Sequence, residues 1–140
     1  NGTIKRNGVA LANVTGAQFT YANGMQGVPT IRNDGLIEAV DPTIINVNGS
    51  IDVRFADTTL VDDAINNNAI ELELAYKLAG LDGNNFSLTW TFHEVYLPRP
   101  RIPVSGPGGV QASFNWQAVY DDALSKSVTV VLKNDVTSYP

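Results

Sequence analysis

The chain contains no cysteine, one histidine and one methionine among its 140 residues. The absence of cysteine excludes a disulfide framework and any zinc site built from thiolates. Because His93 is the only imidazole, neither a multi-histidine metal site nor a pair of catalytic histidines can form. Stability must therefore come from apolar burial and backbone hydrogen bonds, and we expect no metal and no cofactor.

Positive charge is also scarce, with 9 Lys and Arg against 14 Asp and Glu, a net charge of −5. Binding to nucleic acid phosphates requires a local excess of basic residues, so DNA is repelled on average. No apolar run approaches the roughly 20 residues that span a bilayer. The segment Asn1–Arg6 lacks the apolar core of a signal peptide. We expect no membrane partner.

The size of the chain predicts one domain over residues 1–140, and its hydrophobic content of 44% is sufficient for a core. Met25 is the only methionine, so the sequence begins without an initiator residue. This start is typical of a processed product or of a domain cut from a longer chain.

Alternation of apolar and polar residues dominates the sequence and predicts antiparallel strands with one buried face. It is clearest over Ile45–Phe55, Glu71–Leu78 and Phe86–His93. After Phe92 the alternation changes phase, which predicts a β-bulge or a lightly buried strand end. The alternation recurs over Val110–Tyr120 and Val128–Leu132, and two more candidate strands lie early in the chain, at Thr3–Val9 and Asn13–Tyr21.

Turns and one helix complete the predicted fold. Four Asn-Gly or Asp-Gly pairs, at Asn7, Asn23, Asp34 and Asp82, accept the positive φ of tight turns. A fifth pair, at Asn48, lies inside a strand, where a glycine predicts a bulge or a close backbone approach. Residues 58–66 read as a short helix with one apolar face and solvated acidic residues near its start. The apolar residues are Leu60, Val61, Ala64 and Ile65, and the acidic residues are Asp62 and Asp63. The fold class is thus all-β, an antiparallel β-sandwich or barrel with one short α-helix.

The residues that carry chemistry do not form a catalytic set. His93 and Glu94 are adjacent on a predicted strand, so their side chains point to opposite faces. A serine or threonine nucleophile would need the histidine as base and an acid to orient it. We therefore expect no enzyme activity. Trp90 and Trp116 fall on the apolar phase of their strands, which favours core residues over a sugar-stacking platform.

A segment rich in proline and glycine, Pro98–Gly109, separates two strand patterns. Proline fixes φ and disfavours helix, so this segment is an extended arm. It carries apolar residues that need a contact, and two interpretations stay open: a contact with another subunit, or a loop folded back on its own domain. The proposed subunit-contact residues are Pro98, Arg99, Pro100, Arg101, Ile102, Pro103 and Val104.

The segments Ser105–Ala118 and Val128–Val136 resemble the end of a tail tube (major tail) protein of long-tailed bacteriophages. Phe19–Asn23 with Thr30–Arg32, and Gly49–Phe55 with the helix after it, are similar to the same family. The resemblance implies a non-enzymatic virion protein, located in the tail and assembled in the bacterial host cytoplasm. It implies stacked rings, commonly hexameric, whose lumen passes DNA without specific binding. Its partners would be copies of itself and other tail proteins. A trimer of two-domain chains is the alternative stoichiometry.

A tube also accounts for the strongly polar second faces of the strands, because a lumen supplies the water that they need. An acidic lumen would repel phosphate and let DNA slide. The alternative is that these residues simply face solvent. The second candidate function is a carbohydrate- or receptor-binding β-sandwich, such as a phage baseplate or fibre module or a lectin. It requires exposed aromatic residues near the loops at Asn23 or Asp82. The candidate lumen face comprises Asn46, Asn48, Ser50, Asp52, Glu71 and Glu73, and the loop Met25–Gly35 is a further candidate contact.

Overall fold

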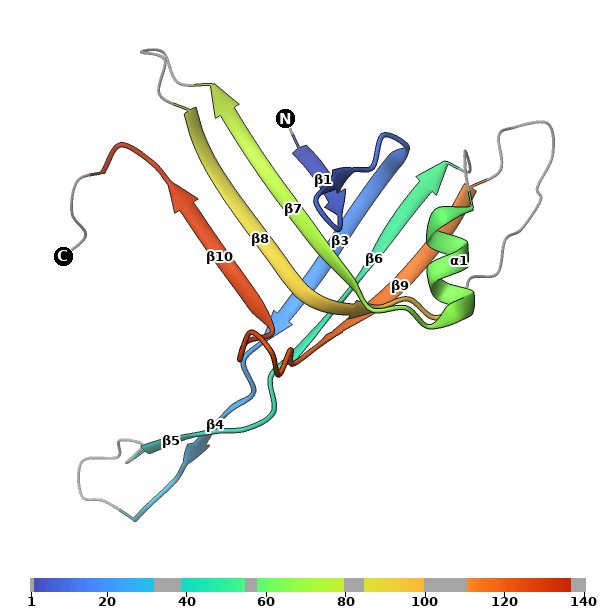
Figure 1. Cartoon of the computed structure of the whole chain (residues 1–140). Helices are drawn as coiled ribbons and strands as arrows, with labels where there is room; N and C mark the ends of the chain where they lie inside the picture. Colours follow the sequence, from blue (N-terminus) through green and yellow to red (C-terminus); the bar gives the residue numbers. More distant parts are fainter. Residues whose placement is uncertain (1, 32–38, 55–57, 80–84, 100–110, 137–140) are drawn as a thin grey trace.

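The computed structural model describes residues 2–31, 39–54, 58–79, 85–99 and 111–136 (Figure 1). Strands dominate, as the alternation predicted, and the all-β fold with one helix is confirmed. The elements in chain order are β1 (Gly2–Arg6), β2 (Val9–Ala10), β3 (Val14–Ala22), β4 (Met25–Val28), β5 (Ala39–Pro42), β6 (Asn46–Arg54), α1 (Thr59–Asn66), β7 (Ile70–Ala79), β8 (Asn85–Tyr96), β9 (Gln111–Val119) and β10 (Val128–Lys133).

The main sheet has the order β2-β1-β7-β8-β9-β6-β3, and β10 also pairs with β8. All its pairings are antiparallel. The long strand β8 pairs with β10 from Ser87 to Phe92 and with β9 from Glu94 to Tyr96. At this point the register between β7 and β8 shifts by one residue, so of the two alternatives predicted for the change of phase after Phe92, the bulge is the one that the structure shows. The sheet thereby bends into two layers that share β8 (Figure 1).

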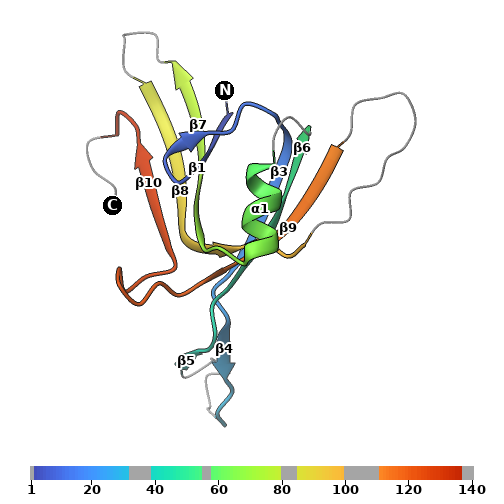
Figure 2. The ribbon, with the colours of Figure 1, turned by 45° about the vertical axis from the view of Figure 1, so that its right-hand side comes forward.

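The core fills the space between the β1–β7–β8–β10 layer and the β3–β6–β9 layer (Figure 2). Phe92 and Trp116 are at its centre, with ring centroids 4.8 Å apart. Trp90 packs against the edge of this core and lies 5.0 Å from the ring of Phe19. Both tryptophans therefore have the structural role predicted for them. Trp116 is buried and therefore cannot stack on a sugar, whereas Trp90 is half-buried.

Gly49 marks the close approach predicted within β6. A Cβ on Gly49 would lie 2.5 Å from Cζ2 of Trp116 and against the backbone oxygen of Gln18. The strand pairings on both sides of β6 stay in register through this residue, so there is no bulge at Gly49. Glycine is required here because the indole ring occupies the position of a side chain.

The helix α1 covers one end of the two layers, with Leu60 and Ala64 buried (Figure 2). Two details of the predicted helix are wrong. Ile65 was expected on the buried face but is 48% exposed. Asp63 was expected in solvent but is 4% exposed, because Arg6 of β1 binds its carboxylate. The contact joins residues 57 positions apart, and helical periodicity carries no information about it.

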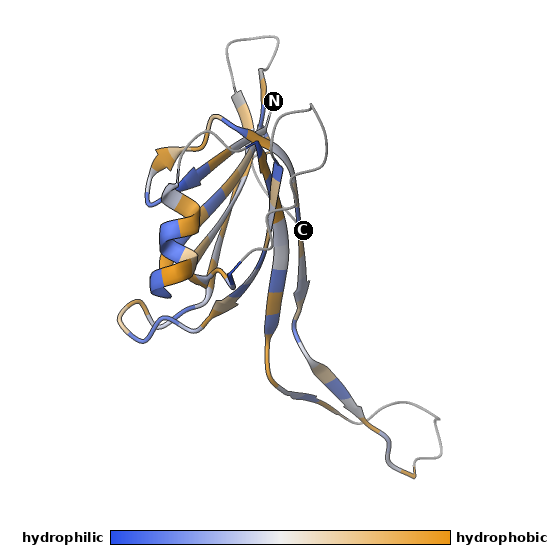
Figure 3. Cartoon of the chain, turned by 90° about the vertical axis from the view of Figure 1, so that its right-hand side faces the viewer, coloured by the Kyte–Doolittle hydropathy of each residue, from blue (hydrophilic) through white to orange (hydrophobic). Residues whose placement is uncertain are grey.

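A second, two-stranded sheet, β4–β5, extends away from the body (Figure 3). It continues the β3–β6 pair beyond a turn at Gly24, whose φ is +57°. The Thr43 backbone N–H donates to the Gly24 carbonyl at 2.8 Å, and the Thr43 hydroxyl donates to the same oxygen. The sequence pattern indicated only a loop here. Positive φ was expected at the Asn7 and Asn23 pairs, and the structure confirms it at Asn7, Gly8 and Gly24.

Candidate functional site

The predicted lumen residues lie on two different outer faces of the molecule. Asn46, Asn48, Ser50 and Asp52 alternate along β6 with the buried residues of that strand, so they point away from the core. Glu71 and Glu73 point away from the core on β7, in the other layer. Because the two layers pack through their inner faces, the two sets of residues do not form one continuous surface.

The outer face of the β3–β6–β9 layer consists almost entirely of amides and hydroxyls. Cross-strand pairing places these side chains in rows, such as Thr20–Asn48–Gln117 and Gln18–Ser50–Asn115. One oppositely charged pair, Asp52 and Arg54, lies at one end of the same face. We call this surface the amide face; its residues are Gln18, Thr20, Asn46, Asn48, Ser50, Asp52, Arg54, Gln111, Ser113, Asn115 and Gln117.

The last residues of β8, Glu94–Tyr96, extend the amide face, and we call them the β8 corner. Tyr96 pairs with Gln117, and Glu94 pairs with Val119. The Tyr96 hydroxyl donates a hydrogen bond to Oε1 of Glu94 at 2.6 Å. This hydrogen bond raises the pKa of Tyr96 above its ordinary value, and desolvation and the charge of Glu94 act in the same direction. Tyr96 is therefore a neutral hydrogen-bond donor. Its acceptor Glu94 adds a second carboxylate to this surface, after that of Asp52.

The outer face of the second layer carries paired charges. Nζ of Lys5 lies 2.7 Å from Oε1 of Glu73. His93 contacts Oε2 of Glu71 through Nδ1 at 3.3 Å and the hydroxyl of Thr129 through Nε2 at 2.7 Å. Each acidic residue predicted for the lumen from β7 thus has a side-chain partner within its own layer.

The β3–β6–β9 layer has unpaired strand edges among the described residues. β3 pairs with β6 alone over its length. Residues Gln111–Trp116 of β9 also have β6 as their only partner strand in that part of the chain. An exposed edge presents unpaired N–H and C=O groups that accept another strand. Both sides of the amide face are therefore suited to pairing with another copy.

Two exposed apolar surfaces lie near opposite ends of the molecule (Figure 1). One is the β4–β5 hairpin with the residues that lead to it, including Met25, Val40 and Ile44. The other is a groove of about 360 Å³ where β7, β8 and β10 extend past the core, which we call the end groove. Alternation predicted buried residues in the end groove, yet these are partly or largely exposed: Tyr76, Leu78, Phe86, Leu88 and Leu132.

The proposed contact arm is only partly within the described residues. Pro98 and Arg99 are exposed. Nη2 of Arg99 reaches the carbonyl oxygen of Ile65 at 3.5 Å. The remaining predicted arm residues, 100–104, lie outside the described part of the chain. Residues 32–35 of the predicted Met25–Gly35 contact lie outside it as well.

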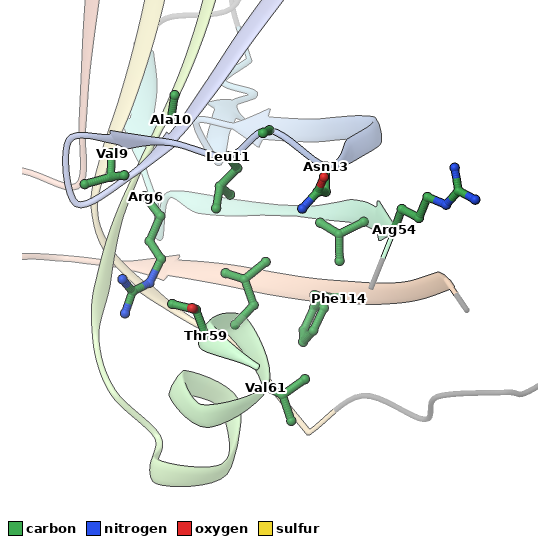
Figure 4. Close-up of a pocket in the computed structure, with 12 residues that line it drawn as sticks. Arg6, Val9, Ala10, Leu11, Asn13, Arg54, Thr59, Val61 and Phe114 are labelled. Carbon is green, nitrogen blue, oxygen red and sulfur yellow. The ribbon is translucent and has the colours of Figure 1, made fainter. Parts of the chain in front are cut away.

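A cavity of about 230 Å³ lies between the β1–β2 hairpin, β6 and α1 (Figure 4). Its wall is formed mainly by apolar side chains such as Leu11, Leu60 and Phe114. Arg6 and Arg54 are its ionisable residues, and Arg6 is bound to Asp63. In the described residues no group of three or more His, Cys, Asp or Glu is placed to hold a metal. No described helix has the length and apolarity to cross a membrane.

Comparison with solved structures supports the fold. The anti-feeding prophage tube-terminating cap aligns with a TM-score of 0.62 at 10% identity, covering 94% of this chain and 88% of the cap. A type VI secretion system effector from Yersinia pestis aligns with a TM-score of 0.50 at 11% identity, covering 95% of this chain and 100% of the effector. At such low identities, these similarities establish the shared fold alone.

Comparison with protein families gives the identity. No curated protein matches the chain. The family described as "Phage tail tube protein" matches residues 1–118. Proteins of this kind are structural components of the virion tail that stack with copies of themselves and associate with other tail proteins. The chain therefore belongs to the phage tail tube protein family, and its role is structural.

Proposed function

We propose that copies of this chain join through the edges of the β3–β6–β9 layer into rings, with the amide face toward a central channel. The observation that carries this proposal is a polar sheet face bounded on both sides by unpaired strand edges. Edge pairing continues one sheet from copy to copy, and a sheet that closes on itself leaves no edge. DNA passes through this channel to the host without specific binding, and the chain has no catalytic role.

The rings stack through apolar surfaces at the two ends of the subunit. The hairpin presents Met25, Val40 and Ile44 at one end, and the end groove presents Leu78 and Leu132 near the other. A contact between unlike surfaces of successive copies is heterologous and generates an open stack. Burial of these side chains stabilises it by roughly 25 cal/mol per Å² of apolar surface. Residues 98–104 remain a proposed additional contact with other copies or other tail proteins, and assembly is proposed to occur in the host cytoplasm.

Single-cysteine variants test which face lines the channel, since the natural chain has no cysteine. Asn48→Cys lies on the amide face, and its matched control Glu73→Cys lies on the outer face of the other layer. In assembled tubes, verified by electron microscopy, we expect a small thiol reagent to modify both cysteines. A maleimide coupled to a globular protein should modify only Glu73→Cys. Equal modification of both variants by the bulky reagent would contradict the proposed orientation.

A further inference from the structure

The amide face carries almost no net charge, although the chain is acidic. Asp52 and Arg54 cancel, and Glu94 at the β8 corner leaves −1 on this surface (two acidic and one basic residue). The whole chain carries −5. The remaining acidic residues of the described chain belong to other elements or to the segments between elements: Asp41, Asp62, Asp63, Glu71, Glu73, Asp121, Asp122 and Asp135.

The residues between these charges donate and accept hydrogen bonds without carrying charge. Asn48 and Gln117 occupy one row, and Ser50 and Asn115 occupy the next. An amide or hydroxyl exchanges a water partner for a ligand partner at a small net change in free energy, typically about 1 kcal/mol. Many similar groups along the wall would keep the interaction energy of a moving polymer nearly constant from one position to the next.

We infer that the tube wall carries little fixed charge, −1 per copy, so that it selects what passes mainly by width rather than by charge. The inference rests on the proposed orientation of the amide face toward the channel. It differs from the acidic lumen expected from the net charge of the sequence, because strand pairing places Glu71 and Glu73 in the other layer and leaves two acidic residues on this face. A wall of fixed negative charge would concentrate cations and repel phosphates, and a basic wall would bind phosphates with release of counterions. A wall with so little fixed charge does either only weakly, and an uncharged polymer of the same width passes nearly as a polyanion does.

The reactivity of Asn48→Cys measures the potential at the wall directly. Two methanethiosulfonate reagents of similar size, one cationic and one anionic, are applied to the unassembled subunit and to assembled tubes at about 20 mM and about 300 mM salt. Low salt extends the screening length beyond about 10 Å, so any wall charge then acts most strongly. We expect assembly and salt each to change the cationic-to-anionic rate ratio by less than about twofold. Asn48→Cys combined with Asn115→Asp provides the calibration, because each copy then adds a carboxylate in the adjacent row.

The outcomes separate the inference from the proposed function. A ratio that rises about tenfold in tubes at low salt, with the bulky reagent still excluded, would show an acidic wall and overturn the inference while leaving the orientation intact. A cationic-to-anionic rate ratio that falls about tenfold in tubes at low salt would show a basic wall and would also overturn the inference. Modification of Asn48→Cys by the bulky reagent would instead refute the orientation. In the calibrated double variant the ratio must rise in tubes at low salt, which shows that the measurement responds to wall charge.

Discussion

Arg6 binds both carboxylate oxygens of Asp63, with Nε 2.5 Å from Oδ2 and Nη2 2.7 Å from Oδ1. The pair joins β1 to α1, and Asp63 also accepts a hydrogen bond from the backbone N–H of Asn68 through its carbonyl. The helix is thereby fixed to the strand layer that does not contain the amide face. Bidentate geometry and burial make this contact a structural connection rather than a surface ion pair.

We expect Asp63→Asn to lower the free energy of unfolding of the unassembled subunit by about 3 kcal/mol, because it leaves a partly buried guanidinium without its counter-charge. Urea denaturation followed by circular dichroism measures the change. The matched control is Asp62→Asn, one residue earlier and exposed, with an expected change within about 0.5 kcal/mol. Equal effects of the two substitutions would show that the buried pair has no special role.

Gly49→Ala should destabilise the subunit by roughly 1–3 kcal/mol, since the added methyl group overlaps the indole of Trp116 and the backbone of β3. The backbone oxygen of Gln18 belongs to a paired strand and cannot move away without breaking the ladder. Gly2→Ala is the control, because the nearest atom to its Cβ is 4.0 Å away. Thermal melting compares the two variants. A Gly49→Ala subunit as stable as the control would mean that the ring has room to shift.

Gly24→Ala should impair stacking while leaving the body folded. The residue has φ of +57°, and its Cβ would meet the backbone of Ile44, so the hairpin must change direction or lose its first hydrogen bonds. The β4–β5 sheet shares no strand pairing with the main sheet, so we expect the melting transition to change little. Sedimentation should show shorter tubes than those of the wild type. The adjacent substitution Asn23→Ala, which does not alter the glycine, should give tubes of normal length.

Leu132→Asp should prevent tube extension, because it puts a charge into the end groove. Leu132 is 59% exposed in the subunit, so the isolated fold tolerates the change. The neighbouring substitution Val131→Asp provides the control, since Val131 pairs with Thr89 on the opposite face of the layer, is 53% exposed and does not line the end groove. Electron microscopy and sedimentation report assembly, and circular dichroism reports folding. If Leu132→Asp tubes form normally, the end groove is not a stacking surface.

The alternation of apolar and polar residues was sufficient to predict β6, β7, β8 and β9. Each of these strands has one face in the core, so every second residue must be apolar. The bulge after Phe92 was predictable for the same reason, since an extra residue must change the phase. The helix at 59–66 was predictable from its apolar spacing and from the asparagines that follow it.

The features that could not be predicted depend on contacts between elements that are far apart in the sequence. Tyr76 and Leu78 continue the apolar phase of β7, but they are 52% and 68% exposed rather than buried. Asp63 is buried because of a residue on another strand. The lumen prediction combined Glu71 and Glu73 with residues of β6, since polarity along a strand shows which face is wet but not which layer it belongs to. Gln18, Thr20 and Asn115 carried the same period-2 signal, but only strand pairing places them beside Asn48.

The bend in β8 has a mechanical consequence for a tube. Because a single strand of 12 residues belongs to both layers, the layer that carries the amide face is covalently continuous with the layer that holds β10 and β7. A force applied to either layer is transmitted through the backbone of β8 and its interstrand hydrogen bonds, as well as through the side chains packed between the layers. Separation of the layers therefore requires β8 to leave its neighbours. The subunit is then expected to respond to load as one rigid unit and to fail in a single step.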